Sequence, residues 1–274
     1  MQVSHEMQVI IRAEIQRIEQ EQDVKILYAC ESGSRAWGFP SLDSDYDVRF
    51  VYVHKPEWYL SIFQRRDVIE YPISDQLDVN GWDLIKALNL FRKSNPPLLE
   101  WLASPIVYHE AYSLAEQIRQ LSPLGFSPRA CMYHYLHMAK GNDRGYLQGE
   151  MVKSKKYFYV LRPVLACRWI VEKGTIPPMS FHTLVDELLP EGLLKSDIHK
   201  LLQRKMSGEE LDLEPRIVSI HEFLAVQIPQ LEQLAGAQVA PAESIDNRLD
   251  QLFRDTLSEV WHTSSTIERG LNPL

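Results

Sequence analysis

Hydrophobic positions recur along this chain with two different periods, and the change of period divides it into two parts. Between residues 25 and 80 apolar residues alternate over short runs, which predicts strands at 25–30, 47–53, 67–72 and 75–80. A helical period comes before them at 5–22 and returns from Asp83. After about residue 110 the helical period continues, and it predicts helices near 111–121, 128–146, 155–173, 181–189, 195–206, 215–235 and 242–262.

Turn and breaker residues divide these segments further. Pro56 predicts a short helix through Phe63, and Asn95-Pro96-Pro97 ends the helix that starts at Asp83. The segment 263–274 has the composition of a frayed tail. The pattern as a whole predicts an α+β protein, with a small mixed-sheet domain at 1–109 followed by an all-helical domain at 110–274. A cleft between two such domains is a common place for a ligand.

Composition limits the function classes without choosing among them. The chain has 274 residues, 45% hydrophobic and 24% charged, which is ordinary for a globular protein. Its formal net charge of −8 argues against a general nucleic-acid coat protein but leaves room for a local basic groove. The apolar runs are too short for a membrane helix and the first residues do not resemble a signal peptide, so we expect a cytoplasmic protein. Three widely spaced cysteines predict neither a disulfide framework nor a zinc site.

Candidate chemistry is concentrated between Ala29 and Tyr52. A Gly33-Ser34 pair follows a strand-like run, and ten residues later Asp45 and Asp47 lead into the next strand. Side chains two apart on a strand project from one face, so these two carboxylates repel each other and need a counter-ion. Hard oxygen ligands of this kind suit Mg²⁺ or Mn²⁺. A glycine turn with free N–H groups and a hydroxyl suits the phosphates that such a metal bridges.

A third carboxylate would complete a metal site, and the chain offers two. Asp78 is flanked by apolar residues on the next predicted strand, where it can face the same side as Asp45 and Asp47. Asp83 is its rival, but its position at a helix start is sufficiently explained by capping, so Asp78 is the favoured ligand.

Two arginines lie close to these carboxylates in the sequence. Arg35 follows the Gly-Ser pair and can reach a phosphate. Arg49 shares the face of Asp47, where it can balance charge in the absence of metal or contact a triphosphate. The alternative for each arginine is a surface salt bridge.

Taken together, these residues resemble a known signature. Gly33-Ser34, Asp45-x-Asp47 and a later apolar-Asp-apolar strand resemble the DNA polymerase β-type nucleotidyltransferase superfamily over about residues 25–80. A bacterial and phage branch of predicted nucleotidyltransferases, some associated with RNA repair, is similar as far as about residue 170. The segments that carry this second likeness are G-S-R-A-W-G-F, S-D-Y-D-V-R-F, N-G-W-D-L-x-K-A-L, E-W-L-x-S-P and K-K-Y-F-Y-V-L-R-P.

The resemblance implies a polymerase β-like palm domain and a two-metal nucleotidyl transfer. Asp45 and Asp47 would bind the metal that holds a nucleoside triphosphate, with ATP favoured, and together with Asp78 a second metal that activates an acceptor hydroxyl. Gly33 and Ser34 would hold the β and γ phosphates, and pyrophosphate would leave.

The opposite wall of the cleft is predicted from the helical part. Lys155, Tyr159 and Arg162 are spaced to lie on one helical face, which can meet a triphosphate, a base or RNA. A solvated amphipathic helix is the plain alternative for this segment. Trp37, beside the glycine turn, is an interface aromatic that can also stack on a base.

The acceptor is the open question of the sequence. An RNA end is the first expectation, because of the branch resemblance. A protein hydroxyl (AMPylation) or a small molecule such as an aminoglycoside is the alternative within enzymology. An alternative of another class is a non-catalytic nucleotide or RNA sensor that keeps the fold for binding.

Overall fold

The computed structural model describes residues 3–73, 76–238 and 244–262, and it confirms the α+β fold class. Its main sheet has five strands in the order β3-β4-β2-β1-β5. β2 pairs in parallel with β4, and the other pairs are antiparallel. The strands are β1 (Val24–Glu31), β2 (Tyr46–His54), β3 (Val68–Glu70), β4 (Leu77–Asp83) and β5 (Val107–Glu110).

One face of the sheet is covered by the first helix, α1 (His5–Gln22). Ser4 begins this helix by accepting a hydrogen bond from the Met7 N–H. Ile11, Ile15 and Ile18 are buried against the sheet, as the period of three and four residues predicted.

The other face of the sheet is covered by helices that come later in the chain: α4 (Leu84–Arg92), α5 (Pro96–Leu102) and α6 (Leu114–Gly125). Two very short helices lie in the sheet's connections, α2 (Gly33–Trp37) after β1 and α3 (Pro56–Tyr59) after β2. The helix predicted from Pro56 therefore ends four residues earlier than expected.

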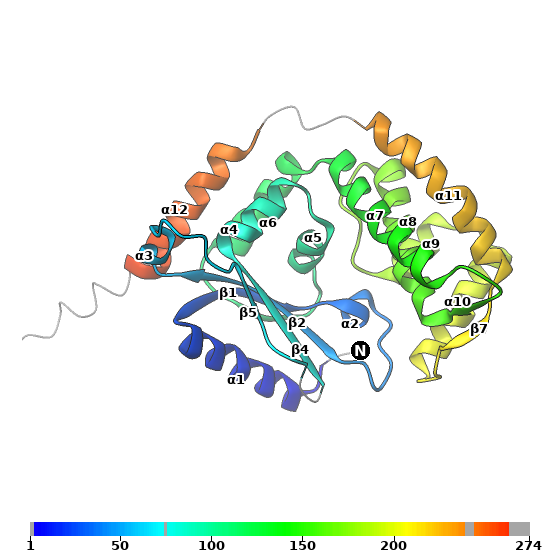
Figure 1. Ribbon diagram of the computed structural model, residues 1–274, viewed down its shortest axis with the longest axis horizontal. Helices are drawn as coiled ribbons and strands as arrows, with labels where there is room; N and C mark the ends of the chain where they lie inside the picture. The colour runs from blue at the N-terminus through cyan, green and yellow to red at the C-terminus, as the bar shows by residue number, and fades with distance from the viewer. Residues whose placement is uncertain (1–2, 74–75, 239–243, 263–274) are drawn as a thin grey trace, which may run out of the picture.

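The remaining chain is mainly helical and lies to one side of the sheet (Figure 1). Its helices are α7 (Pro128–Tyr146), α8 (Tyr157–Lys173), α9 (Phe181–Leu188), α10 (Leu193–Met206) and α11 (Val218–Ala237). It also contains a 3-10 turn, η1 (Ser154–Lys156), and a two-stranded ladder of β6 (Met151–Lys153) and β7 (Leu213–Pro215). The sequence patterns predicted neither these two strands nor β5, because runs of three or four residues are too short to show a period.

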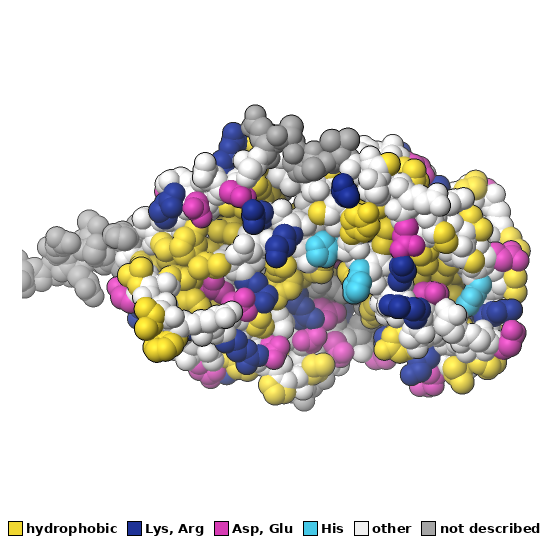
Figure 2. Space-filling model, turned by 45° about the horizontal axis from the view of Figure 1, so that its top comes forward, with side chains coloured by type: hydrophobic (Ala, Val, Ile, Leu, Met, Phe, Trp, Pro, Cys, Tyr) yellow, Lys and Arg dark blue, Asp and Glu magenta, His cyan; other side chains and the backbone are white. Residues whose placement is uncertain are grey.

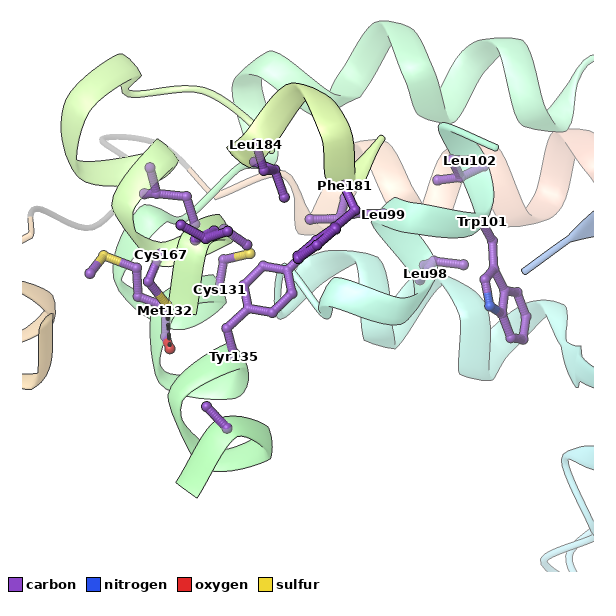
Figure 3. Close-up of a cluster of buried hydrophobic side chains, with 14 of the residues drawn as sticks. Leu98, Leu99, Trp101, Leu102, Cys131, Met132, Tyr135, Cys167, Phe181 and Leu184 are labelled. Carbon is purple, nitrogen blue, oxygen red and sulfur yellow. Dashed lines mark hydrogen bonds between the residues drawn. The ribbon is translucent and has the colours of Figure 1, made fainter. Parts of the chain in front are cut away.

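A single hydrophobic core joins the sheet to the helical part. Leu98, Leu99 and Trp101 of α5 belong to the same buried cluster as Tyr135 of α7 and Phe181 of α9 (Figure 3). The Cys167 thiol of α8 donates to the Met132 carbonyl within this cluster, at 3.6 Å. All three cysteines are buried free thiols. The two parts therefore share their interior and are not joined by a flexible linker.

The last described helix, α12 (Asp246–His262), returns to the sheet side and packs on α4 and α6. Arg92 pairs with Asp246 at 2.6 Å, and Trp261 Nε1 donates to the His54 carbonyl at 3.0 Å. The segment from 110 onward thus contributes two helices, α6 and α12, to the layer above the sheet. Within the described ranges, no helix is long and apolar enough to cross a membrane.

Candidate active site

The tight turn after β1 brings the backbone against Asp47. Gly33 has a φ of +59°, in the left-handed region that favours glycine. A Cβ built on it would lie 2.0 Å from Asp47 Oδ2, and the Ser32 N–H donates to the Asp47 carbonyl at 2.9 Å. Glycine is required here because any side chain would push away the carboxylate that the turn approaches.

Two of the three predicted carboxylates lie side by side. Asp47 of β2 is the register partner of Asp78 of β4, and in a parallel pair register partners project from the same face. Arg49 Nη2 lies 3.0 Å from Asp47 Oδ1 and 2.8 Å from Asp78 Oδ2, and its Nη1 donates to the Asp78 carbonyl at 2.8 Å. The guanidinium is therefore the counter-ion of both carboxylates.

The electrostatics of this pair are those of crowded, half-buried acids. Burial raises the pKa of Asp47, the Arg49 charge opposes that shift, and the negative charges of Asp78 and Asp45 add to it. Among residues 3–73, 76–238 and 244–262, no three histidine, cysteine or acidic side chains are grouped closely enough to hold a metal ion. Asp45, the remaining predicted metal ligand, is the residue before β2, and its side chain is exposed.

The rival carboxylate, Asp83, lies at the far end of β4. It accepts from the Ile85 N–H at 2.8 Å as the cap of α4, and from the Tyr59 hydroxyl at 2.7 Å. Burial raises its pKa to about 6. Its register partner is Tyr52, five residues beyond Asp47. Its position therefore has a complete structural explanation.

A pocket of about 170 Å³ opens beside Asp45 and Asp47. Residues from the sheet part and from the helical part line it together. They are Ser34, Trp37, Phe39, Ser41, Asp43, Ser44, Asp45, Asp47, Lys155, Phe158, Tyr159 and Lys205. The pocket thus brings together five of the predicted site residues; Gly33 and Arg49 lie against Asp47, and Arg49 also contacts Asp78.

The helical wall of the pocket is aromatic and basic. The Tyr159 ring meets Trp37 edge-on, with centroids 5.9 Å apart, and Lys156 Nζ lies 4.8 Å from the Tyr159 centroid. Burial raises the pKa of Tyr159, and the charge of Asp47, which lines the same pocket, raises it further. Lys155 is exposed at the pocket rim.

Two predicted substrate residues lie elsewhere. Arg35 is buried, stacks on the Tyr46 ring at 4.0 Å and donates to the Ser44 carbonyl at 2.9 Å, so it holds the loop before β2. Arg162 is 1% exposed and lies behind Trp37, 4.8 Å from its ring, where it pairs with Glu100. Both arginines shape the walls of the pocket from behind.

Glu100 gathers three donors at the junction of the two parts. The Trp37 Nε1 donates to it at 3.2 Å and the Tyr135 hydroxyl at 2.9 Å, beside the Arg162 guanidinium. Because these side chains come from α2, α5, α7 and α8, the network fixes the aromatic side of the pocket to the helical part.

Two charged groups at the site were missed by sequence reasoning. Glu31 is fully buried, accepts from the Asp47 N–H at 3.1 Å and from the Tyr108 hydroxyl, and burial raises its pKa to about 7. Its place in the sequence, at the end of β1 and two residues before Gly33, was the signal that could have marked Glu31 as a site residue. Lys205, near the end of α10, lies in the pocket 158 residues after Asp47 in the chain (205 − 47), and no spacing in the sequence links the two.

Comparisons with known proteins identify the family of the chain. Residues 7–255 match the model of a family described as the RNA repair pathway DNA polymerase beta family (RlaP). The chain belongs to this family. The match confirms the resemblance drawn from the motifs between Gly33 and Asp78, and it extends through most of the helical part. The family is one of nucleotidyltransferases, and its described role is in RNA repair.

Two further similarities accompany the family match. The uncharacterized protein YcgL of Bacillus subtilis strain 168 is 58% identical over 248 residues, which cover 90% of this chain and 95% of that protein. A crystal structure of a nucleotidyltransferase-like protein from Exiguobacterium sibiricum is similar over 80% of this chain and 74% of that one, with 13% identity and a TM-score of 0.31.

Proposed function

We propose that this family member transfers a nucleoside monophosphate from a nucleoside triphosphate, with ATP favoured, to an acceptor hydroxyl, with an RNA end as the first choice. The oxygen of the acceptor forms a bond to the α-phosphorus, and the bond from that phosphorus to the bridging oxygen breaks. Pyrophosphate leaves with the electron pair, and the Asp78 carboxylate accepts the hydroxyl's proton.

The observation that supports this proposal most strongly is the pairing of Asp47 with Asp78. Two carboxylates placed in register on parallel strands repel each other, and here they share a single guanidinium. The glycine turn lies directly against the Asp47 carboxylate. Such an arrangement costs stability in an ordinary sheet and suits a site that binds cations and phosphates.

Asp47 and Asp78, whose oxygens share one guanidinium, fit a divalent cation, and the exposed Asp45 would have to turn toward them to complete the site. Asp45, Asp47 and Asp78 would hold Mg²⁺ or Mn²⁺, two ions in all, through the hard oxygen ligands that these metals prefer. When bound, the ions would stabilise negative charge on the attacking and leaving oxygens. Arg49 is the counter-ion between Asp47 and Asp78 in this structure, and its guanidinium would release their oxygens to a divalent ion.

The other pocket residues hold the donor. Gly33 and Ser34 receive the phosphates at the turn, and Lys155 neutralises them from the helical side. Tyr159 and Trp37 offer ring faces and edges against which a base can pack. Arg35 and Arg162 act indirectly, since one fixes the loop before β2 and the other fixes Trp37.

The test is a transfer assay with the full chain. We would incubate the protein with Mg²⁺, each α-³²P-labelled triphosphate in turn, and RNA with defined ends. We expect label on the RNA, its loss in Asp47→Asn and Asp78→Asn, and no loss in Asp67→Asn. Asp67 is the matched control, because it is a half-exposed carboxylate of the same domain that pairs with Lys86 at 2.9 Å.

Each other outcome supports a different function. Label on the protein itself or on an added protein, dependent on Asp47, would favour AMPylation. Label on a small molecule such as an aminoglycoside would favour small-molecule nucleotidylation. Triphosphate binding without pyrophosphate release for any acceptor would refute the transferase proposal and favour a sensor.

A further inference from the structure

A second pocket lies on the helical part, between the second half of α7 and α11, and is called the α7–α11 pocket below. Its volume is about 440 Å³, against about 170 Å³ for the pocket beside Asp45 and Asp47. Pockets for small ligands measure about 300–1,000 Å³, so this one is large enough for a ligand. The proposed function gives it no role.

Two polar groups of α11 in its wall lack their usual hydrogen-bond partners. His221 lines the pocket, and its Nε2 is buried without a partner among the described residues. Burial lowers the pKa of His221 and the Arg216 charge lowers it further, while nearby carboxylates oppose the shift, so the ring is neutral at pH 7. Pro229 has no N–H to donate to the Ala225 carbonyl one turn earlier in the helix. A ligand that hydrogen-bonds to these groups would remove the cost of leaving them unpaired.

Two arginines of the lining are available to an anion. Arg144 is exposed, donates from Nε to the Lys140 carbonyl at 3.3 Å, and forms no ion pair within the described ranges. Arg216 pairs at 3.2 Å with Glu150, whose side chain is 84% exposed, and such a surface pair contributes little free energy. Because a guanidinium presents a planar fork of N–H donors, the two side chains suit a phosphate.

The floor of the pocket is apolar. Leu147, at the end of α7, and Leu224 of α11 are its most buried lining residues. Ile228 and Pro229 of α11 add to this apolar lining. A planar ring that packs here removes apolar surface from water, which favours binding.

The three features together fit a nucleotide. Its base would pack on the apolar floor, and its phosphate would meet the two arginines. Asp143 also lines the pocket and accepts from Gln148 Nε2 at 3.0 Å. With the Ala225 carbonyl, the Asp143 carboxylate gives the pocket two hydrogen-bond acceptors, so it should favour a base that carries an amino group.

The short ladder of β6 and β7 connects this pocket to the one beside Asp45 and Asp47. Gly149 lines the α7–α11 pocket two residues before β6, and Lys155 lines the other pocket two residues after it. Six residues of chain (155 − 149) reach at most roughly 20 Å, a distance that a few nucleotides of single-stranded RNA can span.

The surface around the pocket is not generally basic. Over the face shown in Figure 2, lysine and arginine side chains are interspersed with acidic ones, in keeping with the net charge of −8. An RNA strand meets no broad basic field on this face, so local sites must supply its contacts.

We propose that the α7–α11 pocket binds one nucleotide of the acceptor RNA, a few nucleotides from the reacting end, with its base on the apolar floor and its phosphate on Arg144 and Arg216. This inference rests on the proposed function, because an RNA acceptor is what joins the two pockets. The pocket then contributes to the affinity and base preference for the acceptor and takes no part in the chemistry. A free nucleoside monophosphate has the same chemistry, and the experiment separates the two sources.

The experiment measures RNA binding while transfer is blocked. The pocket beside Asp45 and Asp47 is saturated with Mg²⁺ and α,β-methylene-ATP, which cannot release pyrophosphate, and a short oligoadenylate is titrated by calorimetry. Ala225→Phe fills the α7–α11 pocket, and we expect it to weaken binding at least about tenfold. Val226→Phe is the matched control and should bind within about twofold of wild type, because Val226 is the next residue of α11, is 54% exposed and does not line the pocket.

A charge variant separates the phosphate contact from general electrostatics. Arg144→Met should weaken oligoadenylate binding about tenfold. Arg129→Met removes the same charge from an exposed position of α7 outside the pocket and should have little effect. Oligouridylate lacks the amino group on its base, so it should bind wild type several-fold more weakly than oligoadenylate, and this difference should disappear in Ala225→Phe.

Three outcomes would overturn the inference. The first is equal affinity of the two phenylalanine variants, and the second is an equal loss in the two methionine variants. The third is that Ala225→Phe abolishes binding of free AMP but not of the oligonucleotide, because the pocket then takes a free nucleotide and not RNA. The proposed function is judged separately, by nucleotidyl transfer from ATP with the wild-type protein, so its failure is distinguishable from failure of this second pocket.

Discussion

Replacing Gly33 with alanine tests the central geometric relation of the site, the contact between the turn and Asp47. The substitution has two separable effects. A non-glycine residue in the left-handed region costs about 1–2 kcal/mol. The added Cβ would also lie 2.0 Å from Asp47 Oδ2, so the carboxylate must move away. Moving it breaks the contact with Arg49, a charge-assisted hydrogen bond of about 1.5–3 kcal/mol.

Gly174 provides a control that isolates the second effect. It ends α8 with a φ of +68°, close to that of Gly33, and a Cβ there would meet nothing within 4 Å. Gly174→Ala should therefore cost only the conformational term, about 1–2 kcal/mol. Gly33→Ala should cost about 2.5–5 kcal/mol in all, the sum of the two effects.

Both proteins would be compared by urea and thermal unfolding and by nucleotidyl transfer with saturating Mg²⁺. For a chain of this size we expect Tm to fall by roughly 2 °C for each kcal/mol. A carboxylate displaced by about 1 Å should lower kcat about a hundredfold in Gly33→Ala, and Gly174→Ala should retain wild-type kcat. If the two variants have equal unfolding free energies and Gly33→Ala retains transfer, the Gly33 turn does not constrain the Asp47 carboxylate and the reasoning is refuted.

Three shorter predictions address other parts of the site. Burial raises the pKa of Asp83 above its unfolded value, so the free energy of unfolding falls as pH rises from about 4 to about 6. Asp83→Asn keeps the helix cap and should remove this pH dependence, which amounts to up to about 3 kcal/mol of unfolding free energy between pH 4 and 6. The measurement is Tm against pH for both proteins, and parallel curves for wild type and Asp83→Asn would contradict the prediction. Arg162→Met leaves Glu100 buried without its cation and should destabilise the protein by about 3 kcal/mol in urea; a change in the KM for triphosphate alone would instead indicate direct substrate contact. Arg49→Met should lower Tm without metal and make Tm rise more steeply with Mg²⁺ than in wild type, because the divalent ion replaces the missing counter-ion; an unchanged Mg²⁺ response would exclude competition at Asp47.

Much of the sheet half was predictable because its chemistry is local. A Gly-Ser turn, two carboxylates at a spacing of two and a third on a neighbouring strand are constraints that act over a few residues. Asp78 could be preferred to Asp83 because a cap explains Asp83 completely, and the structure shows that cap. The parallel register that sets Asp47 against Asp78 depends on the connection through α3 and β3, which sequence periodicity alone does not fix.

The helical wall was harder because a period identifies faces without saying what each face meets. Lys155 lies in the 3-10 turn before α8, so the spacing of three and four residues that grouped it with Tyr159 and Arg162 changes phase there. α8 is buried over most of its surface, and Arg162 points into the interior toward Glu100. Lys205 reaches the pocket only through the tertiary packing of α10.

The charges of the site are divided between the two parts of the chain, and this division has a consequence for binding. The sheet part supplies the carboxylates Asp45, Asp47 and Asp78, which on their own repel a triphosphate. The helical part supplies Lys155 and Lys205, which on their own lack metal ligands. Because the two parts share one core and the Glu100 network, they hold the opposite charges at a fixed separation without the donor. Affinity for the donor should therefore depend on that junction as strongly as on the residues that touch phosphate, since a preformed pocket avoids the entropy of bringing two domains together.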